Sequence, residues 1–301
     1  MYVYINGEIK EAGDARLSVF EHGFMYGLGL FETFRIYNGH PFLLDDHFRR
    51  MEKGLSLMNI EWKYKRKEVK QQLNDLLEAN QWKNAYVRYN ISAGTGELGL
   101  TTKSYQSPAI IIYMKPLPEA GESRPAEKQG QLLTVRRNSP EASTRLKSHH
   151  YFNSILGKRE AGDDFSIEGL FVNEQGDLAE GVVSNLFWVK GTTIYTPSVQ
   201  TGILNGITRT FVINLARKHS YYIREGRFKP AMLFDADEVF ITNSIQEVVR
   251  LKAVDQYTFN YRDQNKGHSV VDFLQNEYIK YRQQLWNSEE IFFEERKKEN
   301  E

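Results

Sequence analysis

A lysine and an acid in the second half of the chain are the residues whose types and positions first suggest chemistry. Lys147 lies in STRLKSHHY, between an expected strand and an expected helix, with several arginines nearby in sequence. A lysine beside other cations can have a lowered pKa and act as a nucleophilic amine. Glu180 directly precedes an apolar strand, where a carboxylate requires a partner because an unpaired buried charge is costly. Taken alone, Lys147 is more simply a solvated surface lysine.

Two further segments are suited to binding an anion. The sequence GILNGITR, residues 202–209, leads into a helix expected over residues 207–218, with Thr208 in the first turn. Backbone N–H groups at a helix start are unpaired and lie at the positive end of the helix dipole, although a hydroxyl there can simply cap the helix. Ser244 follows an apolar strand expected over residues 238–242 and provides a second hydroxyl. Both segments are candidate anion sites.

Two motifs with familiar functions lack the context that those functions require. Residues 94–99, GTGELG, match the G-x-G-x-x-G pattern of dinucleotide sites, but the sequence that follows, LTTKSYQSP, forms helices poorly. We therefore expect a loop there and no nucleotide site. The adjacent pair His149-His150 makes a poor joint metal site, because neighbouring side chains point to different faces, and no H-x-x-x-H spacing occurs. We expect no metal.

Composition and charge exclude several classes of function. The 301 residues include 39 Lys+Arg and 39 Asp+Glu, so the chain lacks the charge of a protein that acts on nucleic acid or an anionic membrane, although a local basic patch is compatible with this balance. The absence of cysteine excludes disulfides, thiolate zinc sites and a cysteine nucleophile. The strongest apolar run, residues 109–114, is too short to span a membrane, and the N-terminus has no secretory apolar core. These features favour a soluble cytoplasmic protein with small-molecule partners.

Hydrophobic periodicity predicts the elements that position these residues. One-sided helices are expected over residues 43–58 and 67–82, where apolar residues recur at spacings of three and four. Because consecutive strands joined by short turns must be antiparallel, the pattern indicates an α+β fold rather than a doubly wound parallel sheet. The other expected elements are strands over residues 1–5, 85–92, 109–114, 132–136, 182–189 and 192–195, a hairpin over residues 169–178, and a helix over residues 151–161.

A change in composition indicates two domains. The stretch PLPEAGESRPAEKQG holds three of the eight prolines and little that can be buried, which is typical of a linker. We therefore expect a small N-terminal α/β domain over residues 1–116, a linker over residues 117–130, a larger domain over residues 131–285 and a charged tail over residues 286–301.

Together these segments resemble the fold-type IV family of pyridoxal-phosphate enzymes, which includes branched-chain aminotransferases, D-amino-acid aminotransferases and 4-amino-4-deoxychorismate lyases. The similarity covers residues 1–275 in unbroken order and includes EHGFMYGLGLFETFR at residues 21–35. It implies a two-domain α+β fold like that of D-amino-acid aminotransferase, with mixed and antiparallel sheets, whose larger domain binds pyridoxal 5'-phosphate. It also implies a homodimer with the active site between the domains.

The resemblance assigns roles in cofactor binding. Lys147 matches the lysine that forms a Schiff base with the cofactor, and Glu180 matches the acid that pairs with the pyridine nitrogen. A carboxylate there keeps the ring an electron sink, and a phosphate dianion suits a helix N-terminus, hydroxyls and an arginine fork. The residues that match phosphate ligands are Arg50, Ile207, Thr208 and Ser244.

Departures from the family's patterns favour the lyase among its activities. Branched-chain enzymes have a tyrosine where this chain has Phe152, and D-amino-acid enzymes have one where this chain has Phe31. The latter also place an R-x-H carboxylate clamp at the position of residues 94–99. Thr33, in FETFR, instead resembles a threonine that the lyases direct at the substrate. The resemblance thus implies conversion of 4-amino-4-deoxychorismate to 4-aminobenzoate and pyruvate, a carbon–oxygen bond cleavage on the way to folate.

The implied reaction gives roles to the remaining residues. The Lys147 amine removes a proton from the carbon that bears nitrogen, and Thr33 relays a proton to the leaving group unless its hydroxyl is bound by nearby backbone. Arg88 and Arg35 are candidates to bind the substrate carboxylates, with a salt bridge to Glu32 or Glu97 as the structural alternative. Two other functions stay open: an aminotransferase acting on D- or branched-chain amino acids, and a non-catalytic binding module of the same fold.

Overall fold

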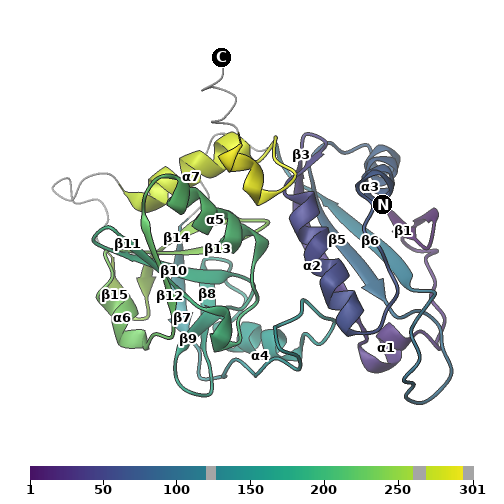
Figure 1. The fold of residues 1–301 in the computed structure, drawn as a ribbon, viewed down its shortest axis with the longest axis horizontal. Helices are drawn as coiled ribbons and strands as arrows, with labels where there is room; N and C mark the ends of the chain where they lie inside the picture. Colours follow the sequence, from purple (N-terminus) through teal and green to yellow (C-terminus); the bar gives the residue numbers. More distant parts are fainter. Residues whose placement is uncertain (120–126, 260–268, 294–301) are drawn as a thin grey trace. The chain divides into compact units, whose positions relative to one another are not determined.

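The computed structural model describes residues 1–119, 127–259 and 269–293. The chain forms two compact units (Figure 1). The first unit comprises Met1–Gly121, Leu146–His150 and Arg282–Asn287, and the second comprises Glu122–Arg145, Tyr151–Tyr281 and Ser288–Glu301. Of the expected linker, residues 117–130, the segment 120–126 lies outside the described residues and the last three residues belong to a strand, Lys128–Leu132. The domain boundaries stay a prediction.

A six-stranded antiparallel sheet, in the order β2-β1-β6-β5-β3-β4, forms the centre of the first unit. The longest strand pairings in this sheet are those of β5 with β3 and of β5 with β6, so β5 lies in the middle of the sheet. Its strands are β1 (Tyr2–Ile5), β2 (Glu8–Glu11), β3 (Gly29–Tyr37), β4 (His40–Pro41), β5 (Ala85–Ser92) and β6 (Ala109–Pro116). The helices of this unit are α1 (His22–Tyr26), α2 (Leu44–Leu57) and α3 (Arg66–Asn80).

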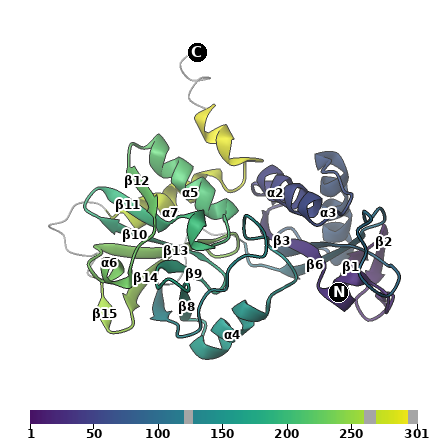
Figure 2. The ribbon, with the colours of Figure 1, turned by 60° about the horizontal axis from the view of Figure 1, so that its bottom comes forward.

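Helices α2 and α3 cover one face of this sheet (Figure 2). The covering follows from their one-sided apolar pattern, since Phe48 of α2 and Leu73 of α3 are buried in one core with Phe34 of β3. Side chains alternate along a strand, so Phe31 and Thr33 of β3 lie on the opposite face of the sheet from Phe34. That opposite face is where candidate catalytic side chains are found.

The segment Leu146–His150 pairs with β3 although it is distant from β3 in sequence. The backbone N–H of Phe31 donates to the carbonyl of Lys147 (2.9 Å), and that of His149 donates to the carbonyl of Gly29 (3.0 Å). An antiparallel bridge joins Leu30 to Ser148. Lys147 and His149 therefore share one face of the pairing, and Ser148 points to the other.

The second unit is built on a nine-stranded mixed sheet. Pairing of β9 with β10 closes β10, β13, β14, β7, β8 and β9 into a ring. The strands are β7 (Lys128–Leu132), β8 (Ile167–Val172), β9 (Leu178–Gly181), β10 (Asn185–Lys190), β11 (Thr193–Pro197), β12 (Tyr222–Gly226), β13 (Glu238–Asn243), β14 (Glu247–Val254) and β15 (Tyr257–Thr258). The helices are α4 (Phe152–Ala161), α5 (Ile207–Lys218), α6 (Pro230–Phe234) and α7 (Val270–Tyr281), with 3-10 turns at Val199–Thr201 and Ser288–Phe292.

Large apolar side chains form the core of the second unit. Trp188, Ile241, Leu251 and Phe228 are buried in one cluster contributed by several strands of the ring. Helix α4 contacts β8, whereas α5 and α7 contact each other and β13 (Figure 1). The start of α5 is thereby attached to a rigid sheet.

The structure confirms the α+β fold with mixed and antiparallel sheets. The helices expected over residues 43–58 and 207–218 correspond to α2 and α5. No strand is predicted from the sequence at the position of β3. Its residues are buried on both faces of the sheet, so apolar and polar residues do not alternate cleanly along it. The strand expected at residues 132–136 lies earlier, at Lys128–Leu132, because the residues that pair with β8 begin within the proline-rich stretch.

The expected charged tail is folded in part. Residues Ser288–Phe292 form a 3-10 turn in which Ile291 is fully buried, and removal of this apolar side chain from water favours the folded turn. Residues 294–301 of that tail lie outside the described residues. Among the helices in the described part of the chain, none is long and apolar enough to cross a bilayer.

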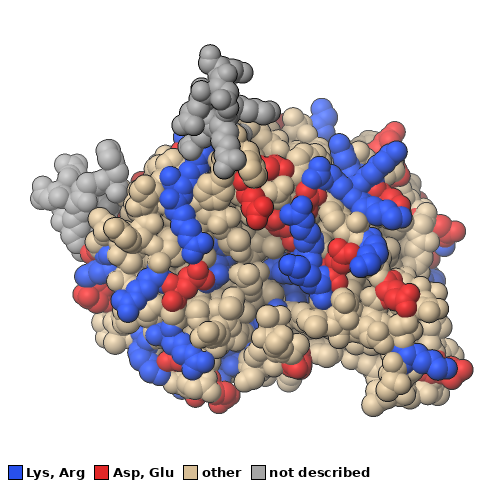
Figure 3. Space-filling model, viewed as in Figure 1, with Lys and Arg blue, Asp and Glu red and all other residues tan. Residues whose placement is uncertain are grey.

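Charged side chains are unevenly distributed on the surface. Figure 3 shows Lys and Arg side chains gathered over α2 and α3. Several of these cations pair with acids: Lys63 with Glu52 (3.4 Å) and Lys65 with Glu68 (2.8 Å). The patch is therefore mixed in charge, which is consistent with the overall balance of the sequence.

Replacement of Phe48 by alanine tests the packing of α2 on the sheet. Phe48 is fully buried and its ring contacts that of Tyr89 (4.8 Å between centroids), so the substitution leaves a cavity and lowers the free energy of unfolding by about 3–5 kcal/mol. Urea denaturation followed by circular dichroism measures the loss. Leu57→Ala, at a 60% exposed position of the same helix, is the control and changes stability by about 0.5 kcal/mol or less. Equal losses in the two variants would contradict this packing.

Candidate active site

Lys147, Arg88 and Thr33 lie around Phe31 on the face of the first unit's sheet that α2 and α3 do not cover. The Lys147 Nζ lies 4.7 Å and the Arg88 Cζ 3.5 Å from the centroid of the Phe31 ring. Thr33 is the direct neighbour of Arg88 across the β3–β5 pair. We call Lys147, Arg88, Thr33 and Phe31 the lysine cluster. It combines an amine, a hydroxyl and a guanidinium on a rigid sheet.

Arg88 and Arg35 differ in their surroundings. The Arg88 Nε donates to the Asn90 side chain (3.1 Å), which orients the guanidinium over Phe31. Arg35 lies further along β3, where its Nη2 donates to the carbonyl of Pro118 (3.1 Å) and its guanidinium lies over Tyr37. Of the two arginines predicted to bind the substrate carboxylates, Arg88 lies in the lysine cluster and Arg35 lies outside it.

His149 completes the same face. Its ring stacks on Phe31 (6.3 Å between centroids) and occupies the space above Gly29, where a Cβ atom would lie 2.6 Å from the imidazole. Burial and, to a lesser extent, the nearby Arg88 lower the pKa of His149 to about 4. The imidazole is therefore neutral at pH 7, and its buried Nε2 has no hydrogen-bond partner among the described residues.

Arg50 lies on the α2 side of β3 and is bound by Glu32. The Arg50 Nε and Nη2 donate to the two carboxylate oxygens at 2.8 and 2.6 Å. Glu32 also accepts a hydrogen bond from His47 (2.7 Å). The alternative in which Glu32 pairs with Arg88 or Arg35 is therefore wrong, because alternation along β3 turns Glu32 away from the face that carries them.

In the second unit, Glu180 is buried and is surrounded by hydrogen-bond donors. Its Oε1 accepts from Arg137 Nε (2.8 Å), and Arg145 lies 3.7 Å away. Its Oε2 accepts from the backbone N–H of Leu204 (2.9 Å) and from Asn185 (3.4 Å). Burial and the neighbouring Arg137 lower the pKa of Arg145 to about 10, which leaves it cationic at neutral pH. Glu180 is thus held in a single orientation beside two positive charges.

The segment that leads into α5 contacts this acid, because the backbone N–H of Leu204 donates to Glu180. Helix α5 begins at Ile207, and its N-cap, Gly206, has no side chain to satisfy the first N–H groups. Thr208 and Ser244 bring their hydroxyl oxygens within 3.1 Å of each other. A Cβ atom at Gly206 would lie 2.0 Å from Asn185, so glycine is required for the turn that leads into the helix. The structure therefore brings Ile207, Thr208 and Ser244 together.

The chemistry of these donors fits pyridoxal 5'-phosphate. The helix start and the two hydroxyls of the second unit suit a phosphate dianion. The carboxyl group of Glu180, which accepts a hydrogen bond from Arg137, is suited to accept one from a protonated pyridine nitrogen. Within the second unit, the groups suited to this cofactor are those of Glu180, Ile207, Thr208 and Ser244.

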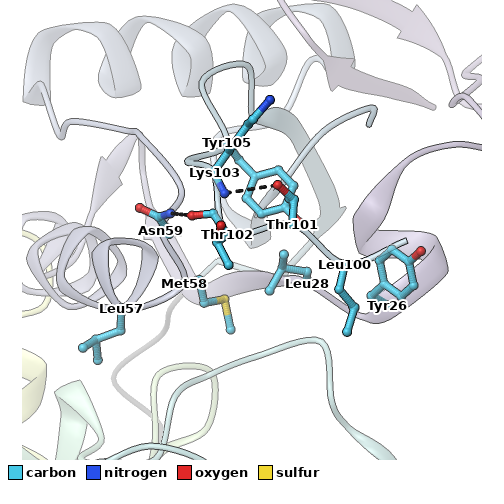
Figure 4. A pocket seen from close by; sticks show the side chains of 10 residues that line it. All are labelled: Tyr26, Leu28, Leu57, Met58, Asn59, Leu100, Thr101, Thr102, Lys103 and Tyr105. Atoms are coloured by element: carbon cyan, nitrogen blue, oxygen red, sulfur yellow. Dashed lines mark hydrogen bonds between the residues drawn. The ribbon is translucent and has the colours of Figure 1, made fainter. Parts of the chain in front are cut away.

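A separate hollow in the first unit has a volume of about 360 Å³. Its lining includes Leu28 and Met58, the loop side chain Leu100, and Tyr105 (Figure 4). Asn59 donates to the carbonyl of Thr102 (3.4 Å) at one rim. The nine predicted site residues, all of which are described, do not line this hollow, so it is distinct from the lysine cluster.

The partners that hold the two acids are not apparent from the sequence. Arg137 and Arg145 are among the arginines near Lys147 in sequence, but in the structure they bind Glu180. His47, to which the sequence pattern assigns no role, binds Glu32. The spacing of His47 and Arg50, three residues apart on a predicted helix, is the signal that places both on one side of α2.

The lowered pKa of His149 predicts a pH dependence of stability. In the unfolded chain His149 takes up its proton near its ordinary pKa of 6.5, but in the folded protein only near 4. Between these pH values the unfolded state binds more protons, so the free energy of unfolding falls as the pH is lowered through this window. His149→Phe removes the contribution and keeps an aromatic ring on Phe31. Urea titrations of both proteins at a series of pH values measure the difference, and parallel profiles would refute the assignment.

Comparison with known proteins shows the family. The model of the amino-transferase class IV family matches residues 29–254. An aminodeoxychorismate lyase of Bacillus subtilis (strain 168) is 44% identical over 281 residues, which cover 92% of this chain and 94% of the relative.

Solved structures have the same fold. A branched-chain amino acid aminotransferase of Escherichia coli superposes with a TM-score of 0.82 at 26% identity, covering 93% of this chain and 94% of the other. The branched-chain amino acid aminotransferase of T.th., complexed with N-(5'-phosphopyridoxyl)-L-glutamate, has a TM-score of 0.79 at 25% identity, covering 93% of both chains. The resemblance found in the sequence is thereby confirmed: the chain belongs to the class IV aminotransferase family.

Proposed function

We propose that this protein is a pyridoxal-phosphate lyase that converts 4-amino-4-deoxychorismate to 4-aminobenzoate and pyruvate, a step toward folate. The observation that carries the proposal is the lysine cluster, in which an amine, a hydroxyl and a guanidinium surround Phe31. The relative that is 44% identical has the name of this activity, which supports the same substrate.

Pyridoxal 5'-phosphate is the cofactor of this family and, when bound, withdraws electrons from the substrate carbon next to the linked nitrogen. Lys147 would hold the cofactor covalently, and Glu180 would pair with the ring nitrogen. The start of α5, with Thr208 and Ser244, would hold the phosphate together with Arg50. These assignments rest on the sequence resemblance and on the donor sets found around Glu180 and at α5.

The residues of the lysine cluster have complementary roles in the reaction. The Lys147 amine accepts the proton from the ring carbon that bears nitrogen. The Thr33 hydroxyl passes a proton to the departing enolpyruvyl group as the carbon–oxygen bond breaks and the ring becomes aromatic. One proton leaves the ring and one is needed to form pyruvate, so no other reactant is consumed. Arg88 binds a substrate carboxylate.

We also propose that the enzyme is a homodimer located in the cytoplasm. Large apolar side chains are exposed on α1 and on a loop bound to it: Phe24 is 79% and Leu100 is 93% exposed. The backbone N–H of Gly99 donates to the hydroxyl of Tyr26 (2.9 Å), which holds this loop against α1. Exposed apolar groups of this kind, beside the hollow that Leu100 lines, support contact with a second chain.

The holo protein incubated with 4-amino-4-deoxychorismate is expected to release 4-aminobenzoate and pyruvate in equal amounts. Borohydride reduction, which makes the link to the cofactor permanent, followed by peptide mapping is expected to place the label on Lys147. Lys147→Ala removes both the label and the activity, because the amine is then absent. A label on another residue would refute the assignment. Stoichiometric glutamate from an amino acid and 2-oxoglutarate, without 4-aminobenzoate, would identify an aminotransferase instead.

Thr33→Ala is expected to lower kcat by roughly 10²-fold or more, because proton transfer by a positioned group contributes about 10²–10⁴-fold. Thr33→Ser keeps the hydroxyl and is expected to retain most of the turnover. Steady-state kinetics with 4-aminobenzoate detection measure both variants. Unchanged turnover in Thr33→Ala would show that its hydroxyl has only a structural role.

A further inference from the structure

We propose that Glu32 is a positioning residue, which orients the guanidinium of Arg50 toward the cofactor phosphate and is itself held by His47. This inference rests on the proposed function, in which Arg50 is a phosphate ligand. The resemblance to pyridoxal-phosphate enzymes assigns no role to Glu32 or His47. Their role follows from the contacts on the α2 side of β3.

The contact between Glu32 and Arg50 holds the planar guanidinium of Arg50 in one orientation. Two parallel hydrogen bonds, from Nε (2.8 Å) and Nη2 (2.6 Å), join it to the two carboxylate oxygens. Such a bidentate pair fixes both the position and the tilt of the fork, whereas a single contact would leave it free to rotate. The Arg50 side chain remains 21% exposed, so it lies at a surface that a ligand can reach.

His47 holds the carboxylate from a second direction. Its Nδ1 lies 2.7 Å from Glu32 Oε2, and both side chains are 2% exposed. An ionised carboxylate can only accept hydrogen bonds, so Nδ1 is the donor. Burial lowers the pKa of His47, which makes the imidazole a neutral donor at pH 7. The two partners of Glu32 are three positions apart on α2, which places both on the side of the helix that faces β3.

The charges of Glu32, Arg50 and His47 allow two effects on phosphate binding to be distinguished. One is the orientation of the Arg50 guanidinium, and the other is its electrostatic attraction for the phosphate. Burial alone would raise the pKa of Glu32, but Arg50 and His47 lower it to about 2, so Glu32 is a carboxylate at neutral pH. A carboxylate beside Arg50 offsets part of the positive charge that a phosphate dianion would meet. If attraction alone mattered, removal of the charge at position 32 would strengthen phosphate binding. If orientation matters more, the same change weakens it.

A second buried carboxylate that is bound by an arginine, Asp45, lies on α2 itself and provides the structural control. Asp45 of α2 is 2% exposed and receives a bidentate contact from Arg66, with a further hydrogen bond from Tyr64 (2.7 Å). Asp45 thus resembles Glu32 in burial and in its partners, but Arg66 has no assigned role in cofactor binding. Asp45→Asn should destabilise the fold in a similar way without a specific effect on the phosphate.

The test compares two aldehydes that differ only in the phosphate. Apo protein of the wild type and of Glu32→Gln is titrated with pyridoxal 5'-phosphate and with pyridoxal, and binding is followed by absorbance. We expect Glu32→Gln to raise the Kd for pyridoxal 5'-phosphate by about tenfold and that for pyridoxal by about twofold or less, because only the former uses the oriented guanidinium. Asp45→Asn is expected to keep the wild-type ratio of the two constants. An unchanged or increased preference for the phosphorylated form in Glu32→Gln would overturn the proposal.

Two further variants allow a conclusion even if Glu32→Gln does not fold or if the proposed role of Arg50 is wrong. His47→Phe removes only the donor to Glu32 and is expected to weaken the preference in the same direction by about threefold. If Glu32→Gln does not fold, a wild-type ratio in folded His47→Phe overturns the proposal. Arg50→Gln separates this inference from the proposed function. If Arg50→Gln keeps the preference for phosphate, the role of Arg50 in the proposed site is wrong; if only Glu32→Gln keeps it, the positioning role alone is wrong.

Discussion

The proposed chemistry requires the pairing of Leu146–His150 with β3. A lysine side chain is long and has many rotamers, and it serves as a base only if its backbone is held in one place. Hydrogen bonds from Phe31 to Lys147 and from His149 to Gly29 anchor the backbone of Lys147 and of the residues that follow it. Gly29 permits this pairing, because a side chain at that position would overlap the ring of His149.

Buried acids held by arginines recur in both units. Glu32 in the first unit and Glu180 in the second each receive a guanidinium Nε at 2.8 Å and further hydrogen bonds from neutral donors. A buried carboxylate is costly unless its oxygens are satisfied, so each acid brings its partners into a defined arrangement. The proposed roles differ: Glu180 would bind the cofactor directly, whereas Glu32 would act through Arg50.

The predictability of the elements follows from their burial. Helices α2 and α5 are predicted because their apolar residues lie on one side and repeat with the helical period. Strand β3 is not predicted, because it is covered on both faces and its sequence, GLFETFRIY, mixes apolar and polar residues without alternation. The same strand supplies Thr33 and Glu32. Hydrophobic periodicity therefore indicates the candidate site less well than the resemblance to the family's motifs does.

Residue types, the order of the motifs and thereby the family can be read from the amino-acid sequence, because a reactive amine, an acid and a glycine-led helix start are local features. Which charges meet is settled only by tertiary packing. Arg137 binds Glu180, and Arg50 with His47 binds Glu32, across separations that no local pattern reports. The reason is geometric: the register of a strand and the face of a helix fix which side chains are adjacent, and both are set by packing of the whole unit.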